Sequence, residues 1–366
     1  MKAINTFSTR VILSHTFLIT KARRVNKRIF IVLLMASALL VMFSKIPSVQ
    51  SETLPSTFDD GKALLIAQKK VKGERTWQPV GWGSGEYITT LPVIRAGVVL
   101  NFESGEVIWS MKLKEKIAPA SLSKLATVAT ALDIADLKTP IFVSEKATNQ
   151  VPTKLGLRPG EVLTLEEAVD AAVMTSANDA TEAIADSLNS GLGNKGNPFM
   201  DLVNLKLEKI GAMDSNFTTP TGLDSENHYS TVYDLAIIAH MVKVDYSLIS
   251  DVASQQYKRL DASLLHRQID LPNWNALLGT YPGVDGLKIG YTQDAGYSTI
   301  VTANRDGRTL MAIVIGANSI ENRERAAATL LNYGFYKYGI EEFPINRIDL
   351  TSRYEDWQYQ LEGNSN

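Results

Sequence analysis

The sequence predicts an α+β fold in which an antiparallel sheet of about five strands is flanked by helices and interrupted by an inserted helical subdomain. Two observations carry this prediction. Strand patterns occur at both ends of the folded region, in 93–111 and 286–315, whereas helical periodicity dominates the chain between them. The sheet must therefore be assembled from distant segments, and a ligand site is expected in the cleft between the sheet and the helical subdomain.

The first strand pattern is a β-hairpin. Val93–Leu100 and Glu106–Met111 are rich in apolar residues and flank a turn at Glu103-Ser104-Gly105. Three more strands are predicted near the end of the folded region, and an Asp-Gly turn joins the last two of them. These strands are Gly286–Thr292, Tyr297–Asn304 and Thr309–Ile315.

A helix is expected from Ser121 to about Ile134, and a later helix begins with a recognisable cap. Thr164 is the expected N-cap residue, because Glu167 stands three positions later and completes a capping box. The first and last helices of the folded domain are expected to lie on a face of the sheet. Further helical patterns cover Lys62–Lys72, Asp179–Leu188, Asn197–Ile210, Val232–Val244 and Ile320–Tyr338.

The chain divides into five expected segments. A basic leader, 1–28, precedes an apolar stretch, 29–43. A spacer punctuated by proline and glycine is expected at 44–92. The folded domain is expected at 93–340, and a polar tail at 341–366 closes the chain.

Residues 1–28 carry seven lysine or arginine residues and no acidic residue, and Ile29–Phe43 is almost uninterrupted apolar sequence. This pattern is typical of a secretory signal peptide or of a membrane anchor, and a buried helix is the third interpretation. The apolar run is long for a signal peptide and shorter than the ~20 residues that span a bilayer, so the first two interpretations stay open. Because positive charge favours the cytoplasmic side, the chain after about residue 50 is expected outside the cytoplasmic membrane, anchored or secreted. An uncleaved segment would make the membrane a partner.

Composition excludes several classes of function. The net charge is −2 and the pI about 6.2, so no nucleic-acid partner is expected. Cysteine is absent, which excludes disulfides, thiol catalysis and thiolate metal sites. The four histidines, His15, His228, His240 and His266, share no ligand spacing, and we interpret each as structural. No metal or cofactor is expected.

Ser121 and Lys124 stand three residues apart where a loop becomes a helix. This spacing places both side chains on one helical face, so the lysine can approach the hydroxyl. Serine is a weak nucleophile until a neighbour takes its proton, and lysine can take it only when burial or a second cation keeps the amine partly neutral. Taken alone, the spacing is more often a helix start with a solvated lysine.

Two further motifs follow in positions that a cleft requires. Ser176 and Asn178 lie two residues apart in the helical region, and Lys288 and Gly290 lie on a predicted strand. Singly, each pattern is commonplace, since the first is usually a helix cap and the second a strand end. Together with the first motif they form, in order, the S-x-x-K, S-x-N and K-T-G set of penicillin-binding proteins and β-lactamases.

The chain resembles the low-molecular-mass penicillin-binding proteins that are D-alanyl-D-alanine carboxypeptidases, which are serine peptidases of the bacterial cell wall. The resemblance covers about Val93–Tyr338 and implies a β-lactamase/transpeptidase-like fold with a penicillin-binding catalytic domain. A class A β-lactamase is excluded, because no Glu-x-x-Leu-Asn segment lies between Asn178 and Lys288. Longer blocks carry the resemblance beyond the three motifs: Thr221–Thr231, Asn273-Trp274-Asn275, Gly283–Lys288 and Ala295-Gly296-Tyr297.

The resemblance implies a role for each motif residue. Ser121 would attack the carbonyl of the penultimate D-alanine in a peptidoglycan stem peptide that ends in D-Ala-D-Ala. Lys124 would take the proton of the serine. The positive charge of Lys288 would lower the pKa of Lys124 and so keep its amine available as a base. Ser176 would relay a proton to the leaving amine, and Asn178 would hold the amide of the substrate. β-Lactams would act as covalent inhibitors.

Position 289 departs from the family pattern, because Ile289 replaces the threonine whose hydroxyl helps to bind the terminal carboxylate. Arg323 matches the carboxylate-binding arginine of the family and is the candidate for this task, with Thr292 as a possible aid. Without the resemblance, Arg323 would be interpreted as a solvated helix arginine. Tyr291 replaces a common histidine, but its backbone N–H is expected to bind the oxyanion together with that of Ser121.

The predicted function is therefore that of an exported serine D-alanyl-D-alanine carboxypeptidase. One alternative is a D,D-endopeptidase of peptidoglycan crosslinks, because the family usually adds a C-terminal β-domain and an amphipathic anchor that we do not recognise in this sequence. Another is an inactive module that binds penicillin or the cell wall, which Ile289 motivates.

Overall fold

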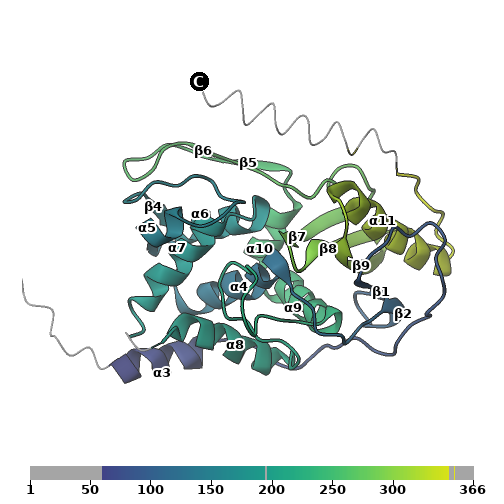
Figure 1. Cartoon of the computed structure of the whole chain (residues 1–366), viewed down its shortest axis with the longest axis horizontal. Helices are drawn as coiled ribbons and strands as arrows, with labels where there is room; N and C mark the ends of the chain where they lie inside the picture. The colour runs from purple at the N-terminus through teal and green to yellow at the C-terminus, as the bar shows by residue number, and fades with distance from the viewer. Residues whose placement is uncertain (1–59, 194–195, 346–349, 351–366) are drawn as a thin grey trace, which may run out of the picture. The chain divides into compact units, whose positions relative to one another are not determined.

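The computed structural model describes residues 60–193, 196–345 and 350 (Figure 1). The predicted leader and the predicted signal peptide or anchor lie outside the described residues, as does most of the predicted tail. Within the described ranges, no helix is long and apolar enough to cross a membrane.

The predicted five-stranded antiparallel sheet is confirmed. Its strand order is β2-β1-β9-β8-β7, so strands from the two ends of the domain pair in its centre, for example at Val98 and Ile313. Strand β7 is an edge strand, and this position decides what it can offer to a ligand. The strands are β1 (Ala96–Asn101), β2 (Val107–Met111), β7 (Val284–Thr292), β8 (Gly296–Arg305) and β9 (Arg308–Ala317).

The two faces of the sheet pack against different parts of the chain. Helix α11 (Ile320–Lys337) covers one face, where Leu331 and Phe335 share a core with Val99 and Val314 (Figure 1). The opposite face, which includes Val98, belongs to the core of the helical subdomain. This division follows from the period of two in a strand, which sends alternate side chains to opposite faces.

Helix α4 (Lys124–Ile134) packs mainly against other helices, whereas we expected it to lie on the sheet. Its first eight residues are all buried, because small and apolar side chains surround the whole circumference of the helix. The short 3₁₀ turn before it, η2 (Ala120–Ser123), contacts the sheet at β7 and β8. The helices around α4 are α6 (Leu165–Met174), α7 (Asn178–Asn189), α8 (Pro198–Ile210) and α9 (Val232–Asp245).

The capping box of α6 is confirmed. The Thr164 hydroxyl accepts the Glu167 N–H at 3.2 Å, and the Glu167 carboxylate accepts the Thr164 N–H at 2.7 Å. Several short elements were not predicted, because each has too few residues to show a period. They are β3 (Pro140–Phe142), α5 (Glu145–Thr148), β4 (Val162–Thr164), α10 (Ser247–Ser254), β5 (Tyr257–Leu260) and β6 (Ile269–Pro272).

Part of the predicted spacer packs on the folded domain. The short helix expected there is α3 (Asp60–Lys70), and it contacts α8 (Figure 1). Just after α3, the Lys72 carbonyl accepts a hydrogen bond at 2.8 Å from Lys206, which is fully buried and forms a 2.7 Å ion pair with the equally buried Asp133. The predicted segment boundaries otherwise stay predictions.

The chain after Lys72 continues along the outer edge of β2. Val80 accepts the Val107 N–H at 2.9 Å, and Ser84 donates its N–H to the Ile108 carbonyl at 2.9 Å. These bonds resemble a parallel strand pairing, although they form only isolated bridges. Residues 80–84 therefore cover the edge of the sheet opposite to β7.

Candidate active site

Ser121 and Lys124 are brought together by a change of helix type. Ser121 lies in the 3₁₀ turn η2, Lys124 is the first residue of α4, and the Lys124 Nζ donates to the Ser121 Oγ at 2.7 Å. Lys124 is completely buried and also donates to the Asn178 Oδ1 at 2.7 Å and to the Thr221 carbonyl at 2.6 Å. The predicted pairing of nucleophile and base is therefore present in the geometry.

Burial decides the charge of both active-site lysines. Burial lowers the pKa of Lys124 to about 7, and the Asp179 carboxylate opposes this shift only in part. The pKa of Lys288 lies well below its usual value, first because of burial and then because of the charges of Lys124 and Arg323. We expected the like charge of Lys288 to keep Lys124 neutral, but desolvation is the main cause.

The second motif lies at the junction of α6 and α7. Ser176 has a φ of 60°, in the left-handed region that non-glycine residues rarely adopt, and strained backbone of this kind is concentrated at functional sites. Asn178 is the first residue of α7, and its Nδ2 donates to the Val151 carbonyl at 2.8 Å while its Oδ1 binds Lys124. Asn178 is therefore held in one orientation from two sides.

The third motif lies on the edge strand β7. Gly290 allows this strand to approach the nucleophile, since a Cβ at this position would lie 3.1 Å from the backbone nitrogen of Ser121. Lys288 is buried and donates to the Ile289 carbonyl at 3.0 Å, whereas Tyr291 is exposed. Because β7 has a free edge, backbone groups that face away from β8 are available to a ligand.

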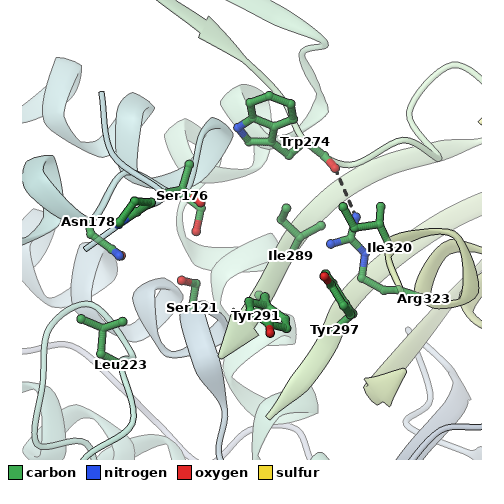
Figure 2. Close-up of a pocket in the computed structure, with 13 residues that line it drawn as sticks. Ser121, Ser176, Asn178, Leu223, Trp274, Ile289, Tyr291, Tyr297, Ile320 and Arg323 are labelled. Carbon is green, nitrogen blue, oxygen red and sulfur yellow. Dashed lines mark hydrogen bonds between the residues drawn. The ribbon is translucent and has the colours of Figure 1, made fainter. Parts of the chain in front are cut away.

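These elements enclose a cavity of about 400 Å³ (Figure 2). Ser121, Ser176 and Asn178 lie at one end, and Ile289 and Arg323 lie toward the other. Lys124 and Lys288 are buried behind the lining. The cavity is lined by Ser121, Pro152, Thr153, Ser176, Asn178, Leu223, Trp274, Ile289, Gly290, Tyr291, Tyr297, Ile320 and Arg323.

The far end of the cavity is mostly apolar. Arg323 lines it but is buried, and its guanidinium donates to the Glu324 carboxylate and, at 3.4 Å, to the Trp274 carbonyl. Thr292 is not among the lining residues, since its Oγ1 accepts the Ala295 N–H at 3.1 Å inside the turn after β7. The aid that we expected from Thr292 therefore has no contact with the cavity.

Six lining residues were not predicted as site residues. Leu223, Trp274 and Tyr297 belong to sequence blocks that carry the family resemblance, so those blocks could have indicated them. Pro152, Thr153 and Ile320 carried no such signal. No group of three or more potential metal ligands occurs in the part of the chain that the structure describes.

The fold and this arrangement of side chains fit the class of serine enzymes that act through a covalent ester, because a hydroxyl contacts a buried, partly neutral amine. Comparison with known proteins identifies the family within this class. The pattern of the peptidase S11 family, D-alanyl-D-alanine carboxypeptidase, matches residues 89–319, and the chain belongs to this family.

A curated relative is the D-alanyl-D-alanine carboxypeptidase DacF of Bacillus subtilis, which is 29% identical over 264 residues. The match covers 70% of this chain and 65% of the relative, so the chain spans less than two thirds of that protein. Two solved structures share the fold. Penicillin-binding protein 5 of Haemophilus influenzae is 25% identical with a TM-score of 0.61. The match covers 69% of this chain and 73% of that structure's chain. Penicillin-binding protein D2 of Listeria monocytogenes, in its ampicillin-bound form, is 26% identical with a TM-score of 0.57. The match covers 68% of this chain and 100% of that structure's chain.

Proposed function

We propose that the protein is a serine D-alanyl-D-alanine carboxypeptidase that removes the terminal D-alanine from peptidoglycan stem peptides. The observation that carries this proposal is the 2.7 Å contact between the Ser121 hydroxyl and the buried Lys124 amine. Membership of the family and the names of the relatives support the substrate. We propose this activity and this substrate for the whole protein.

In the acylation step, the Ser121 Oγ attacks the carbonyl carbon of the penultimate D-alanine while its proton passes to Lys124. The negative charge on the carbonyl oxygen is stabilised by the backbone N–H groups of Ser121 and Tyr291, which the close approach at Gly290 brings near each other. The peptide bond then breaks, and the nitrogen of the terminal D-alanine takes a proton through Ser176. The product is an ester between Ser121 and the shortened peptide.

In the deacylation step, water adds to the ester carbonyl and gives its proton to Lys124. The ester bond breaks, Ser121 regains its proton, and the peptide leaves with a new carboxylate. Asn178 contacts the backbone amide of the substrate at the end of the cavity that holds Ser121, and Arg323 attracts the terminal carboxylate at the far end. None of these steps uses a metal or cofactor.

The same chemistry accounts for a second class of ligand. A β-lactam carries a strained amide bond, so attack by Ser121 opens the ring and leaves an ester with no leaving group to diffuse away. The ampicillin-bound relative supports this extension. We assign the enzyme to the outer side of the cytoplasmic membrane, either anchored or secreted, on the basis of the basic leader and the apolar stretch that follows it.

The test incubates the purified protein with a stem pentapeptide, with a crosslinked muropeptide dimer and, separately, with a fluorescent penicillin. We expect released D-alanine from the pentapeptide and a penicillin adduct on Ser121. The Ser121→Ala variant should give neither, whereas Ser254→Ala, at the exposed end of α10, should give both. Cleavage of the dimer alone would favour the endopeptidase. A wild-type protein with neither product nor adduct would leave only the inactive module.

A further inference from the structure

The Thr221 carbonyl is an active-site group that lies outside the three short motifs, in the block Thr221–Thr231. It accepts the Lys124 ammonium at 2.6 Å and lies 3.5 Å from the Ser121 Oγ, so it fixes the amine against the nucleophile. This carbonyl belongs to a loop that also supplies Leu223 to the cavity. The position of Lys124 therefore depends on what holds this loop in place.

Two buried side chains hold the loop: the Thr127 Oγ1 donates to the Pro220 carbonyl at 3.0 Å, and His228 binds two backbone groups. The His228 Nδ1 lies 3.0 Å from the Thr218 N–H and 3.3 Å from the Thr219 N–H, and both groups donate to it. Two donors converge on this nitrogen, so it must be unprotonated and the ring must carry its proton on Nε2. His228 is 6% exposed, and its ring stacks on Phe217.

Two contacts connect the residues that His228 binds to the position of Thr221. The Thr219 Oγ1 accepts the Gly222 N–H at 3.2 Å, which closes a tight turn around Thr221. Gly222 has a φ of 81°, and a Cβ there would overlap the Ala120 carbonyl, so the turn is pressed against the 3₁₀ turn that carries the nucleophile. A shift of the loop would therefore move the Thr221 carbonyl away from Lys124.

We infer that His228 is a positioning residue whose neutral Nδ1 holds the 218–222 turn, so that the Thr221 carbonyl fixes Lys124 beside Ser121. The inference rests on the proposed function, because it concerns the base of that reaction. His228 therefore has a task beyond the structural one that the sequence alone indicates.

The charges around the ring are compatible with this task. Burial lowers the pKa of His228 to about 4, with Lys124 acting in the same direction and Asp224 in the opposite one. The ring therefore stays neutral wherever Lys124 can act as a base. Lys124 itself faces Asp179 and Lys288 as well as the Thr221 carbonyl.

Loss of the Nδ1 acceptor has a predictable sign. A carbonyl that accepts a hydrogen bond favours the ammonium form of Lys124 over the amine, so its departure lowers the pKa of Lys124 below about 7. The acidic limb of the pH–rate profile, where the acylation rate falls with falling pH, then moves to lower pH. The plateau rate falls at the same time, by roughly 10- to 100-fold, because displacement of a catalytic group by ~1 Å costs about this much.

The test compares His228→Leu, which lacks an acceptor, with His228→Asn, whose Oδ1 occupies the place of Nδ1. Penicillin acylation is measured between pH 5 and 9. We expect the leucine variant to show the lower plateau and the shifted limb, and the asparagine variant to recover both. His240→Leu is the matched control, because His240 is stacked on Trp77 in another part of the domain and its loss should leave the limb in place.

A folded leucine variant with the wild-type rate and limb would overturn the inference. If that variant does not fold, ¹⁵N NMR of the wild-type histidines decides the matter. An Nε2–H tautomer of His228 at pH 7 supports the inference, and an Nδ1–H or doubly protonated ring excludes it. Failure of this inference leaves wild-type D-alanine release intact, whereas failure of the proposed function abolishes that release.

Discussion

Gly290 and Ser121 approach so closely that any side chain at position 290 would press on the nucleophile. A Cβ there would lie 3.1 Å from the Ser121 nitrogen and 3.1 Å from the Ala120 Cβ, which is tighter than nine in ten Cβ contacts. The edge strand β7 and the turn η2 therefore fix their separation through a residue without a side chain. Both N–H groups proposed for the oxyanion depend on this separation.

We predict that Gly290→Ala slows penicillin acylation by about 10- to 100-fold, somewhat less than the ~10²- to 10³-fold effect of removing one oxyanion donor. The new methyl group must push β7 away from η2, which moves the two donors apart. Gly85→Ala is the matched control, because no atom lies within 4 Å of a Cβ there. The second-order acylation rate, measured at one pH, checks the prediction. An unchanged rate in Gly290→Ala would contradict the proposed oxyanion site.

The pH dependence of acylation should follow Lys124, whose pKa burial lowers to about 7. The base acts as the neutral amine, and its neutral fraction falls tenfold for each pH unit below the pKa. We therefore expect the acylation rate to fall tenfold per pH unit below about 7 and to level off above it. Lys124→Ala should remove this limb and lower the plateau by about 10²- to 10⁴-fold. A variant that keeps the limb would show that another group titrates.

Ile289 should limit recognition of the terminal carboxylate. It lines the cavity without a hydroxyl, and a hydrogen bond to a charged group contributes about 1.5 to 3 kcal/mol. Ile289→Thr should therefore speed penicillin acylation roughly 10- to 100-fold. Ile289→Val is the control, since valine has the shape of threonine without its hydroxyl. Arg323→Ala should slow the reaction. If valine accelerates acylation as much as threonine does, cavity volume rather than hydrogen bonding explains the effect.

The buried ion pair of Lys206 and Asp133 should matter for stability and not for catalysis. Lys206→Met leaves the Asp133 carboxylate buried without its counter-charge, and such changes cost about 3 to 5 kcal/mol. The urea unfolding curve at pH 7 measures this loss. Lys138→Met removes an exposed ion pair and should change little.

The double variant Lys206→Met/Asp133→Leu should regain most of the lost free energy of unfolding, because no unpaired charge remains. The acylation rate of the folded single variant should equal that of the wild type. A stability loss in the double variant as large as in the single one would mean that the Lys72 N–H and the Tyr246 hydroxyl, which both donate to Asp133, need this carboxylate as an acceptor.

The elements that the sequence predicted are the long periodic ones. The hairpin turn at 103–105, the Asp-Gly turn at 306–307 and the cap at Thr164 are local signals, and each is present in the structure. Strand β7 begins two residues earlier than predicted, at Val284. The short strands β3 to β6 gave no comparable signal, because tertiary pairing rather than local pattern stabilises them.

Some groups of the candidate site were likewise predictable from local sequence, and others were not. The motif residues were predictable because the chemistry needs a hydroxyl next to an amine, and Ser121 and Lys124 are neighbours in sequence. The Thr221 carbonyl was not predictable, since any residue supplies a carbonyl and only the fold decides where it points. The degree of burial that lowers the pKa of Lys124 is likewise a property of the surrounding helices.

The segment that follows α3 has a practical consequence for any shortened form of this protein. Residues 80–84 occupy the outer edge of β2, whose backbone groups would otherwise be a template for another chain. A protein trimmed to residue 89, where the family match begins, would lose this cover together with the Lys72 partner of the buried lysine. Such a protein would be prone to edge-to-edge self-association, even though every catalytic motif is still present.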